Sequence, residues 1–208
     1  MNKKKQKNFI HLVRRWPAGF RAQRMKVFWL FFSKKNAPAL LLLLAAAPAP
    51  SELNALLDAL KVAPAPSAAA VLTARIEHLW LEQGGPAASL LMARGLRNLQ
   101  SNAADEALAD FDAVVVLSPK MAEAYNQRAM ARFDTGDYAG ALADLREALT
   151  QDPRHFTAFA TLSRIAEARQ DWKGALAAWQ KVLELNPQAP GGAERLKELQ
   201  KKALGEES

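Results

Sequence analysis

Histidine and acidic side chains are the residues of this chain whose types could support acid–base or metal chemistry. The three histidines are scattered: His11 lies in a basic N-terminal segment, His78 on a predicted helix, and His155 in an Asp-Pro-Arg connection. We expect His78 to be a satisfied core residue and His155 to be solvated. The adjacent carboxylates Asp105 and Glu106 fall in a predicted turn between helices, where acidic groups are ordinarily solvated.

The motifs that would organise such side chains into a reaction centre are missing from the sequence. The chain has no cysteine, so it has neither a disulfide framework nor a cysteine metal site. It also lacks the H-E-x-x-H, glycine-rich phosphate-loop and G-x-S-x-G patterns. We therefore predict a protein that is not an enzyme, with no catalytic residues, no cofactor and no bound metal.

The positive charge of the chain is confined to its first segment. The formal net charge is +7, but residues 1–50 hold eleven Lys and Arg residues and no Asp or Glu. Residues 51–208 hold 17 basic and 21 acidic residues, which makes this part of the chain mildly acidic. A surface of that sign repels phosphates, so we expect no nucleic-acid partner.

Residues 1–50 are typical of a leader. A basic stretch precedes an apolar core at 39–47, which has the length of a signal-peptide core and is too short to span a bilayer. The sequence predicts export to the periplasm after cleavage near residues 47–51, with Met1 or Met25 as the start. An uncleaved anchor, which would be the only membrane contact, and a mitochondrial transit peptide are the alternatives.

One regular period runs through the second half of the chain. Pro119, Pro153 and Pro187 lie 34 residues apart, which is the sequence period of this chain, and each follows a turn-forming residue. Alanines recur at the same interval, each followed four positions later by Phe111, Leu145 or Trp179. Each period shows two stretches with helical apolar spacing, separated by a break, so it predicts a helix hairpin.

This pattern resembles the tetratricopeptide repeat family, which has the same period and the offsets A-x₃-F…P. The resemblance implies an all-α, right-handed α-solenoid of stacked helix hairpins with units at 88–121, 122–155 and 156–189. The residues that would pack within and between these units are Gly95, Ala107, Phe111, Pro119, Tyr125, Ala129, Ala141, Leu145, Pro153, Phe159, Ala175, Trp179 and Pro187.

Small residues on the packing face of each predicted hairpin have a physical reason. Gly95, Ala129 and Ser163 are expected to face the alanines of the second helix, so that the two backbones approach closely. A leucine at such a position would overpack the interface, at a cost of about 1–3 kcal/mol.

The segments outside the three units also carry helical patterns. Residues 51–87 predict a degenerate hairpin that covers the N-terminal edge of the array. Residues 190–208 predict a capping helix and tail, with Leu196 and Leu199 on one apolar stripe, because stacked repeats need a solvated end.

The predicted solenoid has a groove lined by the first helix of each unit, and this groove is the candidate binding site. The residues expected to line it are Met92, Leu96, Glu123, Asn126, Gln127, Met130, Ala160 and Arg164. The family implies a protein or peptide partner and a role as an interaction scaffold, here in the cell envelope. The lysine–asparagine–arginine clamp of some relatives is absent. The alternatives are a structural module that self-associates through its ends and a membrane-tethered adaptor.

Overall fold

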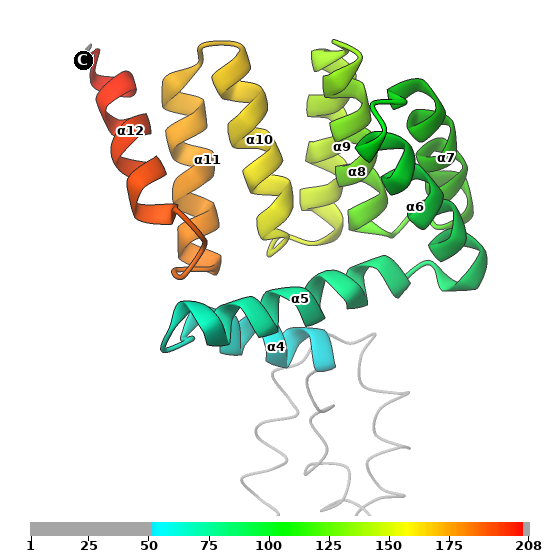
Figure 1. The fold of residues 1–208 in the computed structure, drawn as a ribbon, viewed down its shortest axis with the longest axis horizontal. Coiled ribbons are helices and arrows are strands. Elements are labelled where there is room, and N and C mark those ends of the chain that lie inside the picture. Colours follow the sequence, from blue (N-terminus) through cyan, green and yellow to red (C-terminus); the bar gives the residue numbers. More distant parts are fainter. Residues whose placement is uncertain (1–50, 206–208) are drawn as a thin grey trace, which may run out of the picture. The chain divides into compact units, whose positions relative to one another are not determined.

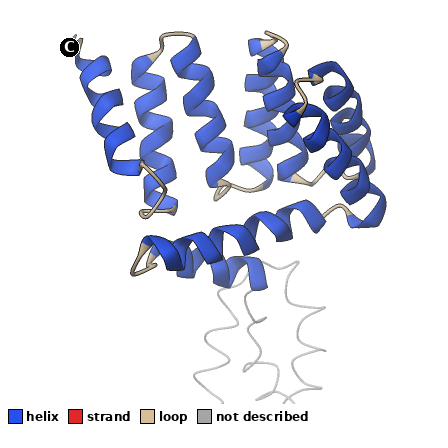
Figure 2. Cartoon of the chain, viewed as in Figure 1, coloured by secondary structure: helices blue, strands red, loops and turns tan. Residues whose placement is uncertain are grey.

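The computed structural model describes residues 51–205, which form helices joined by short turns and contain no strand (Figure 2). The first two helices are α4 (Glu52–Lys61) and α5 (Pro66–Glu82). The others are α6 (Gly85–Gln100), α7 (Ala104–Leu117), α8 (Ala122–Asp134), α9 (Tyr138–Gln151), α10 (Phe156–Ala168), α11 (Trp172–Leu185) and α12 (Gly192–Leu204).

Three helix hairpins stand side by side in chain order. They are α6–α7, α8–α9 and α10–α11, and α12 lies beyond α11 at the end of the array (Figure 1). Each hairpin packs on the next one, so that the described residues form an α-solenoid. The predicted all-α fold of stacked hairpins is thereby confirmed.

The turn inside each hairpin places one residue in the left-handed region of backbone space. Asn102, Gly136 and Gln170 have φ angles of 56°, 83° and 58°, and they are separated by exactly one sequence period each. After two of these turns, the carboxylates of Asp137 and Asp171 each accept a hydrogen bond of 2.9 Å from a backbone N–H at the start of the next helix. The repeat in the sequence is therefore also a repeat of turn geometry and helix capping.

The small residues predicted at the hairpin interface lie where the backbones approach most closely. A Cβ atom added to Gly95 would lie only 2.6 Å from the ring of Phe111, so no larger residue fits there without movement. Ala129 is fully buried, and the hydroxyl of Ser163 donates a 3.0 Å hydrogen bond to the carbonyl oxygen of Ala175. Helix contact in this fold depends on these short side chains.

The predicted packing residues divide into three groups by exposure. The buried ones are Gly95, Ala107, Phe111, Ala129, Ala141, Leu145, Ala175 and Trp179. Tyr125 and Phe159 are partly buried, and Pro119, Pro153 and Pro187 are exposed. The prolines therefore end helices without contributing to the core.

Two hairpins contain an ion pair with a buried aspartate, which the sequence did not lead us to expect. Arg94 binds Asp110 within the first hairpin, and Arg128 binds Asp144 within the second, through both Nε and Nη2. Asp110 and Asp144 are each only 3% exposed. The signal was present in the sequence as an arginine and an aspartate at one fixed separation, repeated after one period.

In the third hairpin the corresponding positions are Leu162 and Ala178, so both charges are absent together. Loss of the pair as a unit is expected, because a single buried charge without its partner is strongly destabilising.

The hairpin α4–α5 does not cover the N-terminal edge of the array, so that prediction was wrong. It runs along the edge of the array that holds the turns between consecutive hairpins, which are the turns that contain the prolines (Figure 1). Ile76 and Trp80 of α5 are fully buried and form one apolar cluster with Phe156 at the start of α10. The apolar stripe of α5 packs against this edge of the array. Because α5 lies there, it does not cover the exposed side of α6.

Hydrogen bonds link α5 and its connection to α6 with the three turns, and each involves the residue that precedes a proline. Ser118 donates to the carbonyl oxygen of Gly84, which follows α5 and caps the start of α6, at 3.2 Å. Asp152 accepts from the indole N–H of Trp80, at 3.1 Å. Asn186 donates weakly to the hydroxyl of Thr73, at 3.5 Å.

At the other end of the array, α12 closes the apolar surface of α11. Leu199 is 1% exposed and Leu196 is partly buried, both in a cluster with Trp179. The indole N–H of Trp179 donates to the carbonyl oxygen of Gly192 at 3.0 Å. Leu196 and Leu199 are thus occupied within the chain, and they do not offer the end surface that the self-association hypothesis requires.

Candidate peptide-binding surface

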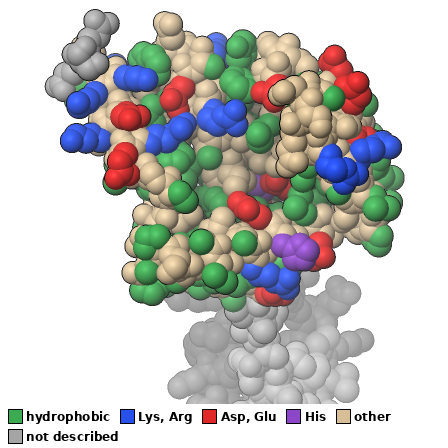
Figure 3. All heavy atoms as spheres, viewed as in Figure 1, with side chains coloured by type: hydrophobic (Ala, Val, Ile, Leu, Met, Phe, Trp, Pro, Cys, Tyr) green, Lys and Arg blue, Asp and Glu red, His purple; other side chains and the backbone are tan. Residues whose placement is uncertain are grey.

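The first helices of the hairpins, α6, α8 and α10, carry the residues predicted to bind a partner. Figure 3 shows a hollow in the middle of this face, above α5. The side chains around such a hollow can either reach solvent or bond to one another, and the structure separates the two cases residue by residue.

Three of the predicted groove residues are buried, so their assignment as partner contacts was wrong. Met92 is 1% exposed and belongs to the core cluster around Phe111. Glu123 is 7% exposed and Asn126 is 1% exposed. Met92 fills space between adjacent hairpins, because the neighbouring core there contains small alanines that leave room for a long side chain.

Asn126 is the centre of a polar network that joins α8 to α10. Its amide nitrogen donates to Glu123 at 3.2 Å and to Thr157 at 3.4 Å, and its amide oxygen accepts from Thr161 at 2.9 Å. Gln127 donates to the other carboxylate oxygen of Glu123 at 2.6 Å. These groups satisfy one another, so Asn126 stabilises the contact between two repeats and is not free for a peptide.

His155 extends this network to α5, and its predicted solvent exposure was wrong. The ring is fully buried and stacks on Trp80 with centroids 3.9 Å apart. Its Nδ1 accepts a 3.3 Å hydrogen bond from the N–H of Ala158, which caps α10, and Nε2 lies 3.1 Å from the carboxylate of Glu123. The imidazole therefore has a structural role at the junction of α5, α8 and α10.

Glu77 of α5 lies close enough to this junction for its charge to be affected. Partial burial of the carboxylate raises the pKa of Glu77, the charge of Glu123 raises it further, and His155 lowers it. The prediction that His78 is a core residue was wrong: its side chain is 56% exposed and lies 3.4 Å from the carboxylate of Glu82.

The remaining predicted residues are accessible to different degrees. Leu96, Gln127, Met130 and Ala160 are partly buried, and Arg164 is exposed. Leu96, Met130 and Arg164 occupy equivalent places in the three hairpins, because each follows the last by one sequence period. We call these three residues the inner column.

The inner column changes in character along the array, from apolar at Leu96 and Met130 to cationic at Arg164. The guanidinium of Arg164 lies 5.7 Å from the ring centroid of Phe133, and it forms no ion pair with any described residue. A surface of this kind can take an apolar group at one end and a carboxylate at the other.

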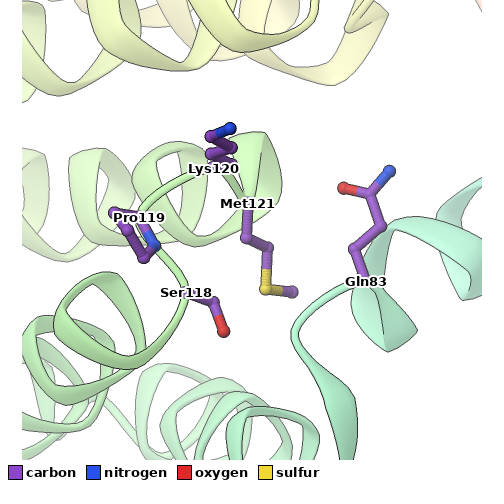
Figure 4. A pocket seen from close by; sticks show the side chains of 5 residues that line it. All are labelled: Gln83, Ser118, Pro119, Lys120 and Met121. Carbon is purple, nitrogen blue, oxygen red and sulfur yellow. The ribbon is translucent and has the colours of Figure 1, made fainter.

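A separate pocket of about 490 Å³ opens at the edge occupied by α5 (Figure 4). It lies between the end of α5 and the turn from α7 to α8, and it is lined by Gln83, Ser118, Pro119, Lys120 and Met121. The sequence did not predict it, because its two sides come from segments that are distant along the chain and meet only through the unforeseen course of α5.

Within the described part of the chain, residues 51–205, no group of three or more His, Cys, Asp or Glu side chains is arranged to hold a metal ion. None of the helices in this range combines the length and apolar character that a bilayer crossing requires.

Comparison with known proteins identifies the repeat region. Residues 126–190 match a family model described as tetratricopeptide repeat. A tetratricopeptide repeat-containing protein of Rhizobium etli is 28% identical over 153 residues, which is 74% of this chain and 75% of that protein.

Solved structures with the same arrangement of helices share little sequence with the chain. The first repeat domain of human RPAP3 has a TM-score of 0.54 and 21% identity, covering 58% of this chain and 94% of that one. A complex of the first repeat domain of Spaghetti (RPAP3) with the HSP90 peptide SRMEEVD gives 0.53 and 23%, covering 57% and 94%. A yeast Sti1 domain in complex with an Hsp70 segment gives 0.51 and 20%, covering 58% and 98%. The family match, the bacterial relative and the shared fold together support the tetratricopeptide repeat family for this chain.

Proposed function

We propose that this chain is a non-catalytic adaptor that binds a peptide or helix of another protein on its inner column. The observation that carries this proposal is the series Leu96, Met130 and Arg164, which occupies equivalent places in the three hairpins and is partly or fully exposed. Similar folds are solved in complexes with HSP90 and Hsp70 segments, which supports a protein partner in general.

The chemistry of the inner column specifies the segment that would bind. Leu96 and Met130 offer partly buried apolar surface, and the flexible thioether of Met130 adapts to different apolar side chains. Arg164 offers a guanidinium for a carboxylate. The preferred segment therefore crosses α6, α8 and α10, with apolar side chains against Leu96 and Met130 and an acidic group against Arg164.

A charge-reversed variant tests this surface directly. Arg164→Glu should weaken a bound segment by about five- to thirtyfold, which corresponds to about 1–2 kcal/mol for an ion pair at a partly exposed site. Met130→Glu should abolish apolar capture. Val71→Glu, on an exposed position of α5, is the matched control and should retain full binding.

The measurement is selection from a random peptide library on the purified chain, followed by titration calorimetry of the selected peptides with each variant. Selected peptides rich in apolar and acidic residues, with affinity lost in the two inner-column variants, would support the proposal. Peptides that bind all three variants equally would refute it.

The location of this adaptor is also proposed. The leader pattern of residues 1–50, which lies outside the described residues, favours export to the periplasm and a role in the cell envelope. An adaptor tethered by an uncleaved leader is the second candidate. N-terminal sequencing of the protein from fractionated host cells distinguishes the two, since a start between residues 47 and 51 in the soluble envelope fraction excludes tethering.

A further inference from the structure

The outer side of α6 exposes residues whose equivalents are covered in the next hairpin. This side, which we call the α6 edge, consists of Ala87, Leu90, Arg94 and Arg97, and all four are exposed. The equivalent residues one sequence period later are Met121, which caps α8, and Ala124, Arg128 and Ala131 of α8. Met121, Ala124 and Ala131 are at most 2% exposed, whereas Leu90 is 73% exposed.

The two arginines show what the α6 edge lacks. Arg94 and Arg128 both donate hydrogen bonds from Nε and Nη2 to the aspartate of their own hairpin. Arg128 uses its third nitrogen, Nη1, to donate a 2.9 Å hydrogen bond to Asp112 on α7 of the preceding hairpin. Arg94 has no such contact among the described residues, and its side chain is 59% exposed where that of Arg128 is 15% exposed.

The structure itself thus displays how this kind of edge is covered: a helix lies along it and supplies a carboxylate to the outer arginine. We propose that the α6 edge binds an acidic amphipathic helix of another protein, packed as α7 packs on α8. One carboxylate of that helix meets Nη1 of Arg94, a second meets Arg97, and small side chains between them accommodate Leu90.

Charge decides between this occupant and two others. Residues 1–50 of the chain contain no Asp or Glu, so the leader cannot supply a carboxylate to Arg94. The exposed end helix α12 carries four basic residues against two acidic ones, so a second copy stacked end to end would set cations against Arg94 and Arg97. An acidic helix from a different protein is the occupant that satisfies both arginines.

A probe for this site can be taken from the chain itself. The probe is a synthetic peptide with the sequence of α7, residues 104–117, with blocked ends and a staple across the exposed positions 105 and 109 to hold it helical. Its partner peptide carries Asp112→Asn. Both are titrated into the full-length chain and followed by fluorescence anisotropy and by amide chemical shifts.

We expect saturable binding with shifts concentrated at residues 87–97. Arg94→Lys, which keeps a cation beside the buried Asp110 but lacks the fork that can hold two carboxylates, and Asp112→Asn in the probe should each weaken binding about five- to tenfold, with little further loss when the two are combined. Leu90→Ala, which makes the edge resemble α8, should tighten binding. Met130→Glu should not change binding of the probe to the α6 edge. The result for this proposal is therefore independent of the result for the inner column.

Three results would overturn the proposal. One is the absence of saturable binding to both the unmodified chain and Leu90→Ala. The second is a set of chemical shifts located away from residues 87–97. The third is a chain that is dimeric by light scattering and becomes monomeric on Leu90→Asp, because the occupant would then be a second copy.

Discussion

The contact between Gly95 and Phe111 provides a quantitative test of how the first hairpin packs. A Cβ atom at position 95 would lie 2.6 Å from one ring carbon of Phe111 and 2.8 Å from another. Ordinary carbon–carbon contacts are about 3.5–4.0 Å, so Gly95→Ala forces the ring or the helix to move by about 1 Å. The ring is fully buried and cannot turn into solvent.

The expected cost follows from two opposing effects. Overpacking of this kind costs about 1–3 kcal/mol, and replacing a mid-helix glycine by alanine returns up to about 1 kcal/mol of helix propensity. Gly95→Ala should therefore lower the free energy of unfolding by up to about 2 kcal/mol, in spite of its better helix propensity. Phe111→Leu alone should also destabilise, by about 1–2 kcal/mol, because it leaves a gap beside the glycine.

The second hairpin contains the compensated arrangement. Its equivalent residues are Ala129 and Leu145, which are 0% and 1% exposed. The double variant Gly95→Ala with Phe111→Leu copies that pair and should be within about 1 kcal/mol of the unmodified chain, because the shorter side chain makes room for the new methyl group. Urea denaturation followed by circular dichroism measures all four proteins.

The cycle gives a clear criterion. If the double variant loses as much stability as the two single variants together, to within about 0.5 kcal/mol, the two positions are independent and the close approach described above does not control the packing.

Three further changes test other parts of the structure. Trp80→Phe keeps a stacked ring but removes the hydrogen bond to Asp152. It should lower the free energy of unfolding by about 1–3 kcal/mol and speed amide hydrogen exchange in α5. Unchanged exchange would argue against a fixed α5. Glu77→Gln should stabilise the chain at pH 7, because a raised pKa in the folded state means that ionisation opposes folding; the advantage should shrink as the pH falls through the raised pKa and disappear below the usual glutamate pKa of about 4.3, as urea titrations at pH 7 and pH 4 would reveal. Trp179→Ala should cost about 3–5 kcal/mol and melt α12 first, which tryptic cleavage within residues 192–204 would report; equal cleavage in both proteins would contradict it.

The sequence was sufficient for the repeated part of the fold. Positions such as Ala107, Ala141 and Ala175 identified the hairpin interfaces because each interface is local and recurs with one period. The same reasoning could have found the ion pairs of Arg94 and Arg128, since both partners follow that period.

The sequence was not sufficient for contacts that break the period. The course of α5 depends on Trp80 meeting His155 and Phe156, which lie more than two repeats further along the chain and follow no pattern shared with α5. This is why His155 was predicted to be solvated and why the α6 edge was predicted to be covered.

The groove prediction failed for a related reason. Helical spacing gives the direction of a side chain, but it does not show whether neighbouring polar groups will bond to each other. Asn126 lies on the first helix of its hairpin, where the groove was predicted, yet Glu123 and Thr161 occupy its hydrogen-bonding groups and the side chain is buried.

The three bonds that α5 and its connection to α6 make to the turns have a consequence for how this protein can change in length. Thr73 and Trp80 of α5, and Gly84 in the connection from α5 to α6, meet successive turns in reverse chain order, so one helix and the residues that follow it span the whole series. Inserting an additional hairpin would displace at least one turn from its anchoring residue, and deleting one would leave an anchoring residue without a turn. Unlike repeat arrays in which each unit contacts only its neighbours, this chain can gain or lose a repeat only together with a matching change in α5.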